Sequence, residues 1–169
     1  MTKTAITGAR IFDGATWHDI AIDQPADLTD VSAVGSEAWA VGSVPDDPNG
    51  TEQPIVLHST DHGDTWTAIG TGLPSSRRIN AVTFTDATHG WVVGAYGLAL
   101  TTRDGGKSWQ SLVGRIPNPG GKHLYAVRQD AGSLLVAGEQ GVLFRSGDGG
   151  ANFEKIPTPY AGTFFGALP

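Results

Sequence analysis

A short motif recurs three times in this chain of 169 residues, at a nearly constant spacing. The copies read STDHGDTW at 59–66, TRDGGKSW at 102–109 and SGDGGANF at 146–153. Their aspartates, Asp61, Asp104 and Asp148, are 43 and 44 residues apart. A fixed period of this length indicates a repeat architecture, in which each copy is one supersecondary unit.

Two further landmarks follow the same period. The sequences WAVG, WVVG and LVAG begin at positions 39, 91 and 135, and apolar stretches at 28–34, 79–84 and 124–128 precede them. An insertion within 44–53 lengthens the first interval. In the middle repeat, short apolar or alternating runs at 79–85, 90–94, 98–102 and 108–113 are separated by glycine-rich turns, which predicts four strands per repeat.

These observations predict an all-β fold, namely a β-propeller of four-stranded antiparallel blades in a single module, 1–169. We expect full blades at 27–70, 79–113 and 124–157, the last two strands of a blade at 4–23, and the first strand of a further blade at 162–168. At the observed period, 169 residues hold fewer than four blades. An open blade edge invites pairing, so we expect self-association, with a homodimer completing the ring. A four-blade monomer and a fragment are the alternatives.

The recurring motif has a mechanical interpretation. Its aspartate can accept hydrogen bonds from the backbone of its own turn, its glycine permits a positive φ, and its final aromatic ring can pack between blades. We therefore assign structural roles to one set of residues: Asp61, Gly63, Trp66, Asp104, Gly106, Trp109, Asp148, Gly150 and Phe153.

The motif S/T-x-D-x-G-x-S/T-W is the Asp-box, or BNR repeat. The fuller pattern at 80–84, 90–94 and 102–109 resembles the photosystem II assembly factor-like family of propellers, and the resemblance covers about 27–157. It implies a non-catalytic binding or assembly scaffold. Asp-boxes also occur in sialidases, xyloglucanases and sortilin-type receptors, so the motif specifies the fold rather than the activity.

In such blades, the turn after the second strand and the link to the next blade lie at one end, opposite the Asp-boxes. We expect protein or small-ligand binding on this inter-blade loop face. The candidate binding residues are Arg77, Arg78, Tyr96, Arg115, His123 and Glu139.

The alternative is a carbohydrate-active propeller, either a lectin-like binder or a sialidase-like glycosidase. Arg115-Ile116-Pro117 resembles an arginine motif of sialidases, and Tyr96 with Glu139 is a conceivable nucleophile pair. Paired carboxylates from Asp46, Asp47, Glu52 and Glu139 would be needed for other glycosidases. The question of catalysis stays open, and binding is favoured.

The composition argues against several functional classes. Lys and Arg total 11 against 17 Asp and Glu, for a net charge of −6, which argues against nucleic-acid binding. There is no cysteine, and the five histidines are scattered, so we expect neither a metal nor a cofactor. The sequence contains no signal peptide or membrane-spanning run, which makes the cytoplasm the default expectation. It does not identify the ligand.

Overall fold

The computed structural model describes residues 5–12, 15–21, 26–45, 52–130 and 132–167. Among them, strands and turns dominate, and the helical residues form a single 3-10 turn, η1 (Ala95–Gly97). The all-β class expected from the sequence is confirmed. No helix in the described part of the chain is long and apolar enough to cross a membrane.

Three four-stranded antiparallel sheets follow one another along the chain, each with its strands in sequence order. The first contains β3 (Asp27–Val34), β4 (Glu37–Pro45), β5 (Glu52–Ser59) and β6 (Thr67–Ile69). The second contains β7 (Ile79–Phe84), β8 (Gly90–Gly94), β9 (Ala99–Thr102) and β10 (Gln110–Ser111). The third contains β11 (Leu124–Asp130), β12 (Ser133–Gly138), β13 (Leu143–Ser146) and β14 (Glu154–Lys155). A two-stranded sheet of β1 (Ala5–Phe12) and β2 (Trp17–Ala21) precedes them.

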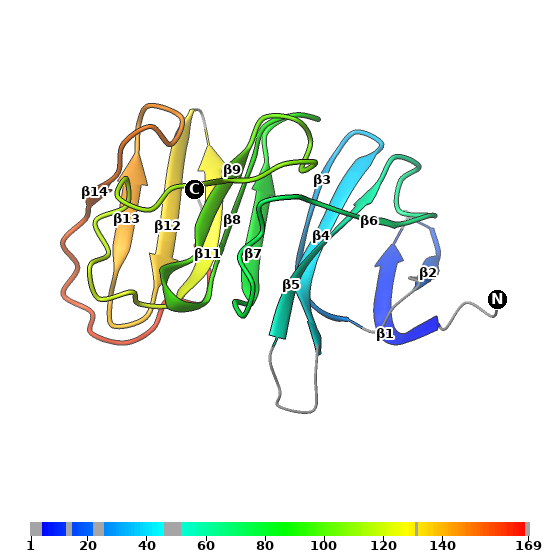
Figure 1. The fold of residues 1–169 in the computed structure, drawn as a ribbon, viewed down its shortest axis with the longest axis horizontal. Helices are drawn as coiled ribbons and strands as arrows, with labels where there is room; N and C mark the ends of the chain where they lie inside the picture. The colour runs from blue at the N-terminus through cyan, green and yellow to red at the C-terminus, as the bar shows by residue number, and fades with distance from the viewer. Residues whose placement is uncertain (1–4, 13–14, 22–25, 46–51, 131, 168–169) are drawn as a thin grey trace.

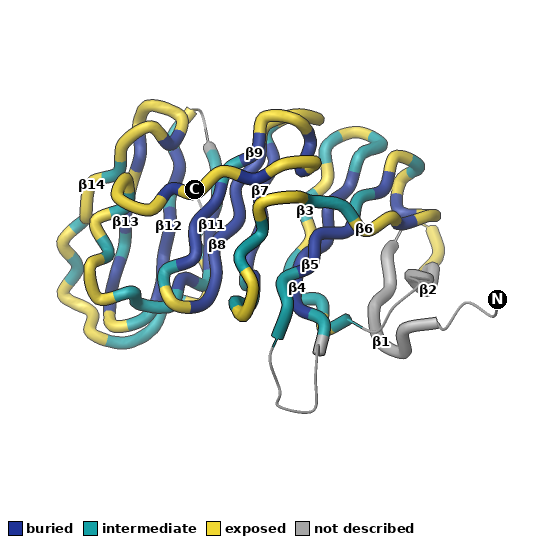
Figure 2. Tube along the Cα trace, viewed as in Figure 1, coloured by how far each residue is buried: buried dark blue, intermediate teal, exposed yellow. Residues whose placement is uncertain are grey.

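The sheets stack as successive blades (Figure 1), and the first strands β3, β7 and β11 lie against one another. One apolar cluster joins the first and second blades around Trp39 and Val92, and another joins the second and third around Trp91 and Phe144. Burial therefore follows the middle of each sheet, whereas β14 and many of the turn residues are exposed (Figure 2). The core lies between blades, as in a propeller whose repeats cannot bury their apolar faces alone.

The contact between the first two blades centres on Trp39. Its ring stacks on Phe84 of the next blade, with centroids 3.7 Å apart and planes 6° apart. Its indole Nε1 donates a hydrogen bond to the carbonyl oxygen of Gly105, at 2.8 Å. Since Gly105 belongs to the second Asp-box, the second strand of one blade is joined directly to the turn of its neighbour.

Each Asp-box closes on its own aspartate. In the second box, Asp104 Oδ1 accepts the backbone N–H of Ser108 at 2.9 Å and the hydroxyl of Thr102 at 2.8 Å. The Thr102 hydroxyl oxygen in turn accepts the N–H of Gly106 at 2.9 Å. The same bonds recur around Asp61 and Asp148. The three turns thus share one set of hydrogen bonds, which depends on an ionised carboxylate.

These hydrogen bonds lower the pKa of all three carboxyl groups to about 2. The largest cause is the Thr65 hydroxyl at Asp61, the Ser108 hydroxyl at Asp104 and the Asn152 backbone N–H at Asp148. A carboxylate with a lowered folded pKa stabilises the fold above its unfolded pKa, about 3.9, and loses that effect as pH falls through the folded value.

We therefore expect the free energy of unfolding to fall steeply between pH 4 and pH 2. Asp104→Ala is expected to lower the free energy of unfolding by about 1–2 kcal/mol at pH 7, because the N–H and hydroxyl groups of the turn lose their carboxylate acceptor. The variant's free energy of unfolding should also depend less on pH between pH 4 and pH 2. Urea titrations across this pH range measure both effects. Asp64→Ala, at an exposed residue of the first box, is the control. An unchanged stability and slope for Asp104→Ala would contradict the structural role of the box.

The structure differs from the sequence expectation in two segments. The fourth strand predicted at 108–113 is reduced to Gln110–Ser111, because the N–H of Ser108 binds Asp104 and that of Trp109 binds the Thr71 carbonyl oxygen. The strand predicted at 162–168 is absent over its described part, 162–167. There, the backbone makes single hydrogen bonds instead of a ladder, such as Phe164 N–H to Gly138 O at 3.0 Å.

Candidate functional site

The innermost strand of every complete sheet carries a β-bulge at the same place. The pairing register shifts between Leu28 and Asp30, between Ile79 and Ala81, and between Leu124 and Ala126. The extra residue is Thr29, Asn80 or Tyr125, respectively. A bulge re-aims the side chain of its extra residue, and here it directs three equivalent side chains toward one end of the blade stack.

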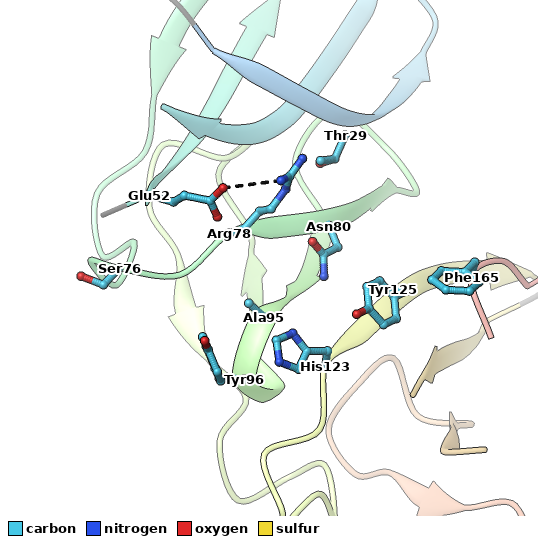
Figure 3. Close-up of a pocket in the computed structure, with 10 residues that line it drawn as sticks. All are labelled: Thr29, Glu52, Ser76, Arg78, Asn80, Ala95, Tyr96, His123, Tyr125 and Phe165. Atoms are coloured by element: carbon cyan, nitrogen blue, oxygen red, sulfur yellow. Dashed lines mark ion pairs between the residues drawn. The ribbon is translucent and has the colours of Figure 1, made fainter. Parts of the chain in front are cut away.

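These side chains line a groove of about 760 Å³. The groove lies at the end that holds the turn after β8 and the links between blades, opposite the Asp-boxes. Figure 3 shows the residues that line it, which come from all three complete blades and the C-terminal segment: Thr29, Glu52, Ser76, Arg78, Asn80, Ala95, Tyr96, His123, Tyr125 and Phe165.

Two of the bulge residues also join neighbouring blades. The Thr29 hydroxyl donates to the carbonyl oxygen of Ile79 at 2.8 Å. The side-chain amide of Asn80 donates to the carbonyl oxygen of Leu124 at 2.9 Å. The floor of the groove is therefore fixed by inter-blade hydrogen bonds, which favours a site that is formed before any ligand arrives.

The six candidate binding residues have different positions. Arg78, Tyr96 and His123 line the groove. Arg77 lies beside it and donates through Nη1 to the Tyr96 carbonyl oxygen at 3.3 Å. The Glu139 carboxylate accepts the backbone N–H of His123 at 3.0 Å, so it supports the wall without lining the groove. Arg115 is exposed and is not among the lining residues.

Sequence reasoning missed Thr29, Asn80, Tyr125 and Phe165 as site residues. The first three follow the aligned apolar positions 28, 79 and 124, where strict strand alternation gives no reason to single them out. The repeat alignment offered one usable signal: positions 29, 80 and 125 are equivalent, yet each blade has a different residue there, whereas the neighbouring apolar position is kept. The bulge that turns these side chains inward is not visible in the sequence.

The charged groups of the groove are paired. Arg78 Nη1 lies 3.5 Å from Glu52 Oε1, and both side chains are partly exposed. Glu52 is the carboxylate that the described residues contribute to the lining; Asp46 and Asp47 lie outside the described residues. Within the described part of the chain, His, Asp and Glu side chains form no group of three that could hold a metal ion. The groove is thus suited to binding a largely uncharged ligand.

Three consecutive Asp-box blades with a groove at the opposite end define a β-propeller binding module. The chain belongs to the photosynthesis system II assembly factor YCF48 family, whose model matches residues 71–160.

Curated relatives are longer than this chain. The photosystem II assembly lipoprotein Ycf48 of Synechococcus sp. (strain CC9902) is 32% identical over 75 residues, which cover 44% of this chain and 22% of the relative. The photosystem II stability/assembly factor HCF136 of Oryza sativa subsp. japonica is 28% identical over 150 residues, which cover 78% and 35%. The chain therefore spans about a third of these relatives or less.

Two solved structures have the same fold. A structure described as YCF48 bound to D1 peptide aligns with a TM-score of 0.69 and 26% identity, covering 94% of this chain and 47% of that one. YCF48 from Cyanidioschyzon merolae aligns with a TM-score of 0.64 and 20% identity, covering 83% and 43%. Both alignments support the propeller expected from the sequence.

Proposed function

We propose that this chain is a non-catalytic binding module that holds a segment of a partner polypeptide in the groove during assembly of a protein complex. The observation that carries the proposal is the groove itself, which is lined by equivalent bulge residues of three blades and has its charges paired. The relatives support it, because they are assembly factors by name and one was solved with a D1 peptide.

The lining fits an extended peptide. Asn80 and Ser76 supply side-chain groups that can hydrogen-bond a peptide backbone. Tyr125 and Phe165 supply an apolar surface for its side chains. A volume of about 760 Å³ lies in the range of ligand pockets and accommodates several residues.

The carbohydrate-active alternative has weaker support. Glycosidases generally need two carboxyl groups that flank the scissile bond, about 5–10 Å apart. In the described part of the groove, the carboxylate is Glu52, and it is engaged by Arg78. Glu139 binds a backbone N–H outside the lining. No observation favours a sialidase-like arrangement of Arg115, Tyr96 and Glu139.

The proposal is tested by measuring, through fluorescence anisotropy, whether this chain binds short, overlapping, fluorescently labelled peptides of the D1 protein. We expect at least one peptide to bind, and Phe165→Ala to weaken its binding by about tenfold, because an aromatic contact is lost. Val113→Ala is the matched control, since both side chains are equally open to solvent (75% and 78% exposed) and Val113 lies outside the groove. The proposal fails if no peptide binds, or if both variants weaken binding equally.

Self-association remains a prediction of the sequence. A second copy would supply the rest of a ring of the size of the YCF48 structure, of which this chain covers 47%. The groove would then face the symmetry axis and gain residues from both copies. A measurement of the mass of the chain in solution tests whether it self-associates.

A further inference from the structure

One wall of the groove is a row of four rings from three separate segments of the chain. We call Tyr96, His123, Tyr125 and Phe165 the aromatic wall. Ring centroids are 4.7 Å apart for Tyr96 and His123, 6.3 Å for His123 and Tyr125, and 5.1 Å for Tyr125 and Phe165. Figure 3 shows the row on one side of the groove, with Arg78 and Glu52 on the other. Such spacings are those of aromatic rings in contact.

Tyr96 occupies this wall in an unfavourable backbone conformation. Its φ is +53°, in the left-handed region that bulky side chains avoid, and Gly97 follows at +72°. Turns of this kind favour Asn or Gly at the first position. Burial does not offset the cost, because Tyr96 is 62% exposed. Gln140, in the equivalent turn of the next blade, has a similar φ of +55° and lies outside the groove, so this conformation belongs to the repeated turn. What distinguishes Tyr96 is that its turn holds an exposed ring in the groove.

The opposite wall does not favour a charged ligand side chain. Its guanidinium and its carboxylate, Arg78 and Glu52, are directed at each other. Because the two charges largely offset each other, a charged ligand group would gain little attraction there and would lose part of its own hydration on entering the groove. An uncharged ring entering the groove would instead contact several partly exposed rings and remove apolar area from water.

We propose that the aromatic wall binds an aromatic side chain of the partner segment, and that Tyr96 is the residue that determines this specificity. This inference rests on the proposed function, because it names the chemistry of the segment that the groove would hold. In the second blade, the turn at 96–97 holds an exposed ring beside His123 in the groove.

N-acetyl-tryptophanamide is the direct probe, titrated into the labelled chain and followed by 1H–15N NMR. We expect saturable shifts centred on the aromatic wall, with a Kd on the order of 1 mM for so small a ligand. N-acetyl-alaninamide should cause no saturable shift there. The inference is overturned if the shifts caused by the tryptophan probe do not saturate, or if both probes cause equal shifts. It is also overturned if chitotriose binds the same residues more tightly than the tryptophan probe does.

Two glycine variants isolate Tyr96. Tyr96→Gly removes the ring and relieves the positive φ, so we expect the tryptophan probe to bind at least about fivefold more weakly while the Tm does not fall. Gln140→Gly is the matched control, because Gln140 has a φ of +55° before a glycine in the equivalent turn of the next blade and lies outside the groove. Probe binding should survive it. Unchanged binding in Tyr96→Gly would overturn the assignment.

The outcomes separate this inference from the proposed function. If the tryptophan probe binds the aromatic wall and no D1 peptide binds, the proposed partner is wrong and the wall is correctly assigned. If D1 peptides bind and the tryptophan probe does not, the binding function stands and the aromatic specificity is wrong.

Discussion

Replacing Gly94 by alanine is expected to lower the free energy of unfolding by about 3 kcal/mol. Gly94 ends β8 opposite the bulge of β7, and a Cβ there would overlap the carbonyl oxygen of Arg78. The overlapping atom belongs to the backbone, so no side-chain rotation relieves it. The equivalent glycines Gly42 and Gly138 face the carbonyl oxygens of Asp27 and His123 in the same way. The repeated glycine is therefore the counterpart of the repeated bulge.

Chemical denaturation of Gly94→Ala against Gly147→Ala tests this expectation. A Cβ on Gly147 would meet nothing within 4 Å, and its φ lies outside the left-handed region. We expect the control to stay within about 0.5 kcal/mol of the parent chain, as surface substitutions usually do. The shape of the groove should also change in Gly94→Ala, because the overlap would displace the backbone of Arg78, which lines the groove. Equal stabilities for the two variants would mean that the bulge can shift, and that it does not fix the groove.

Trp39→Phe is expected to lower the free energy of unfolding by about 2–4 kcal/mol. Trp91→Phe is expected to lower it clearly less, although the two tryptophans occupy equivalent positions of adjacent blades. Trp39 is fully buried, and its Nε1 donates to Gly105 O. Its replacement leaves a cavity and an unsatisfied carbonyl oxygen. The Nε1 of Trp91 is buried without a hydrogen-bond partner among the described residues, so phenylalanine removes an unsatisfied donor there.

Urea unfolding of both variants, followed by circular dichroism, measures this difference. We expect Trp39→Phe to be the less stable variant by about 1–3 kcal/mol, the cost of one unsatisfied buried group. The double variant should show additive losses, because the two rings belong to different apolar clusters. A larger loss for Trp91→Phe would contradict the role given to the Trp39–Gly105 hydrogen bond in joining the blades.

Much of the fold could be predicted from the repeat. The Asp-box and the glycine of the second strand are signals within one repeat, because the first depends on residues of a single turn and the second on one hairpin of the same blade. The start of the last strand of the second blade and the C-terminal segment were harder to predict. Ser108 and Trp109 look like strand residues, yet their N–H groups bind Asp104 and Thr71 and delay β10. Residues 162–167 have a strand-like pattern and form only isolated hydrogen bonds.

The candidate site was predicted only in part, for a physical reason. Arg78, Tyr96 and His123 could be assigned to the loop-bearing end because blade topology determines which turns share a face. Tyr125 and Phe165 could not, because a bulge and an irregular segment direct them into the groove.

Repetition in the sequence determines the blades, since each turn and strand pairing is encoded within about 44 residues. Only the tertiary structure decides which side chains meet between blades. The aromatic wall gathers residues from positions 96 to 165, and the Arg78–Glu52 pair joins two blades. Such contacts depend on the stacking of whole sheets, which no local pattern encodes.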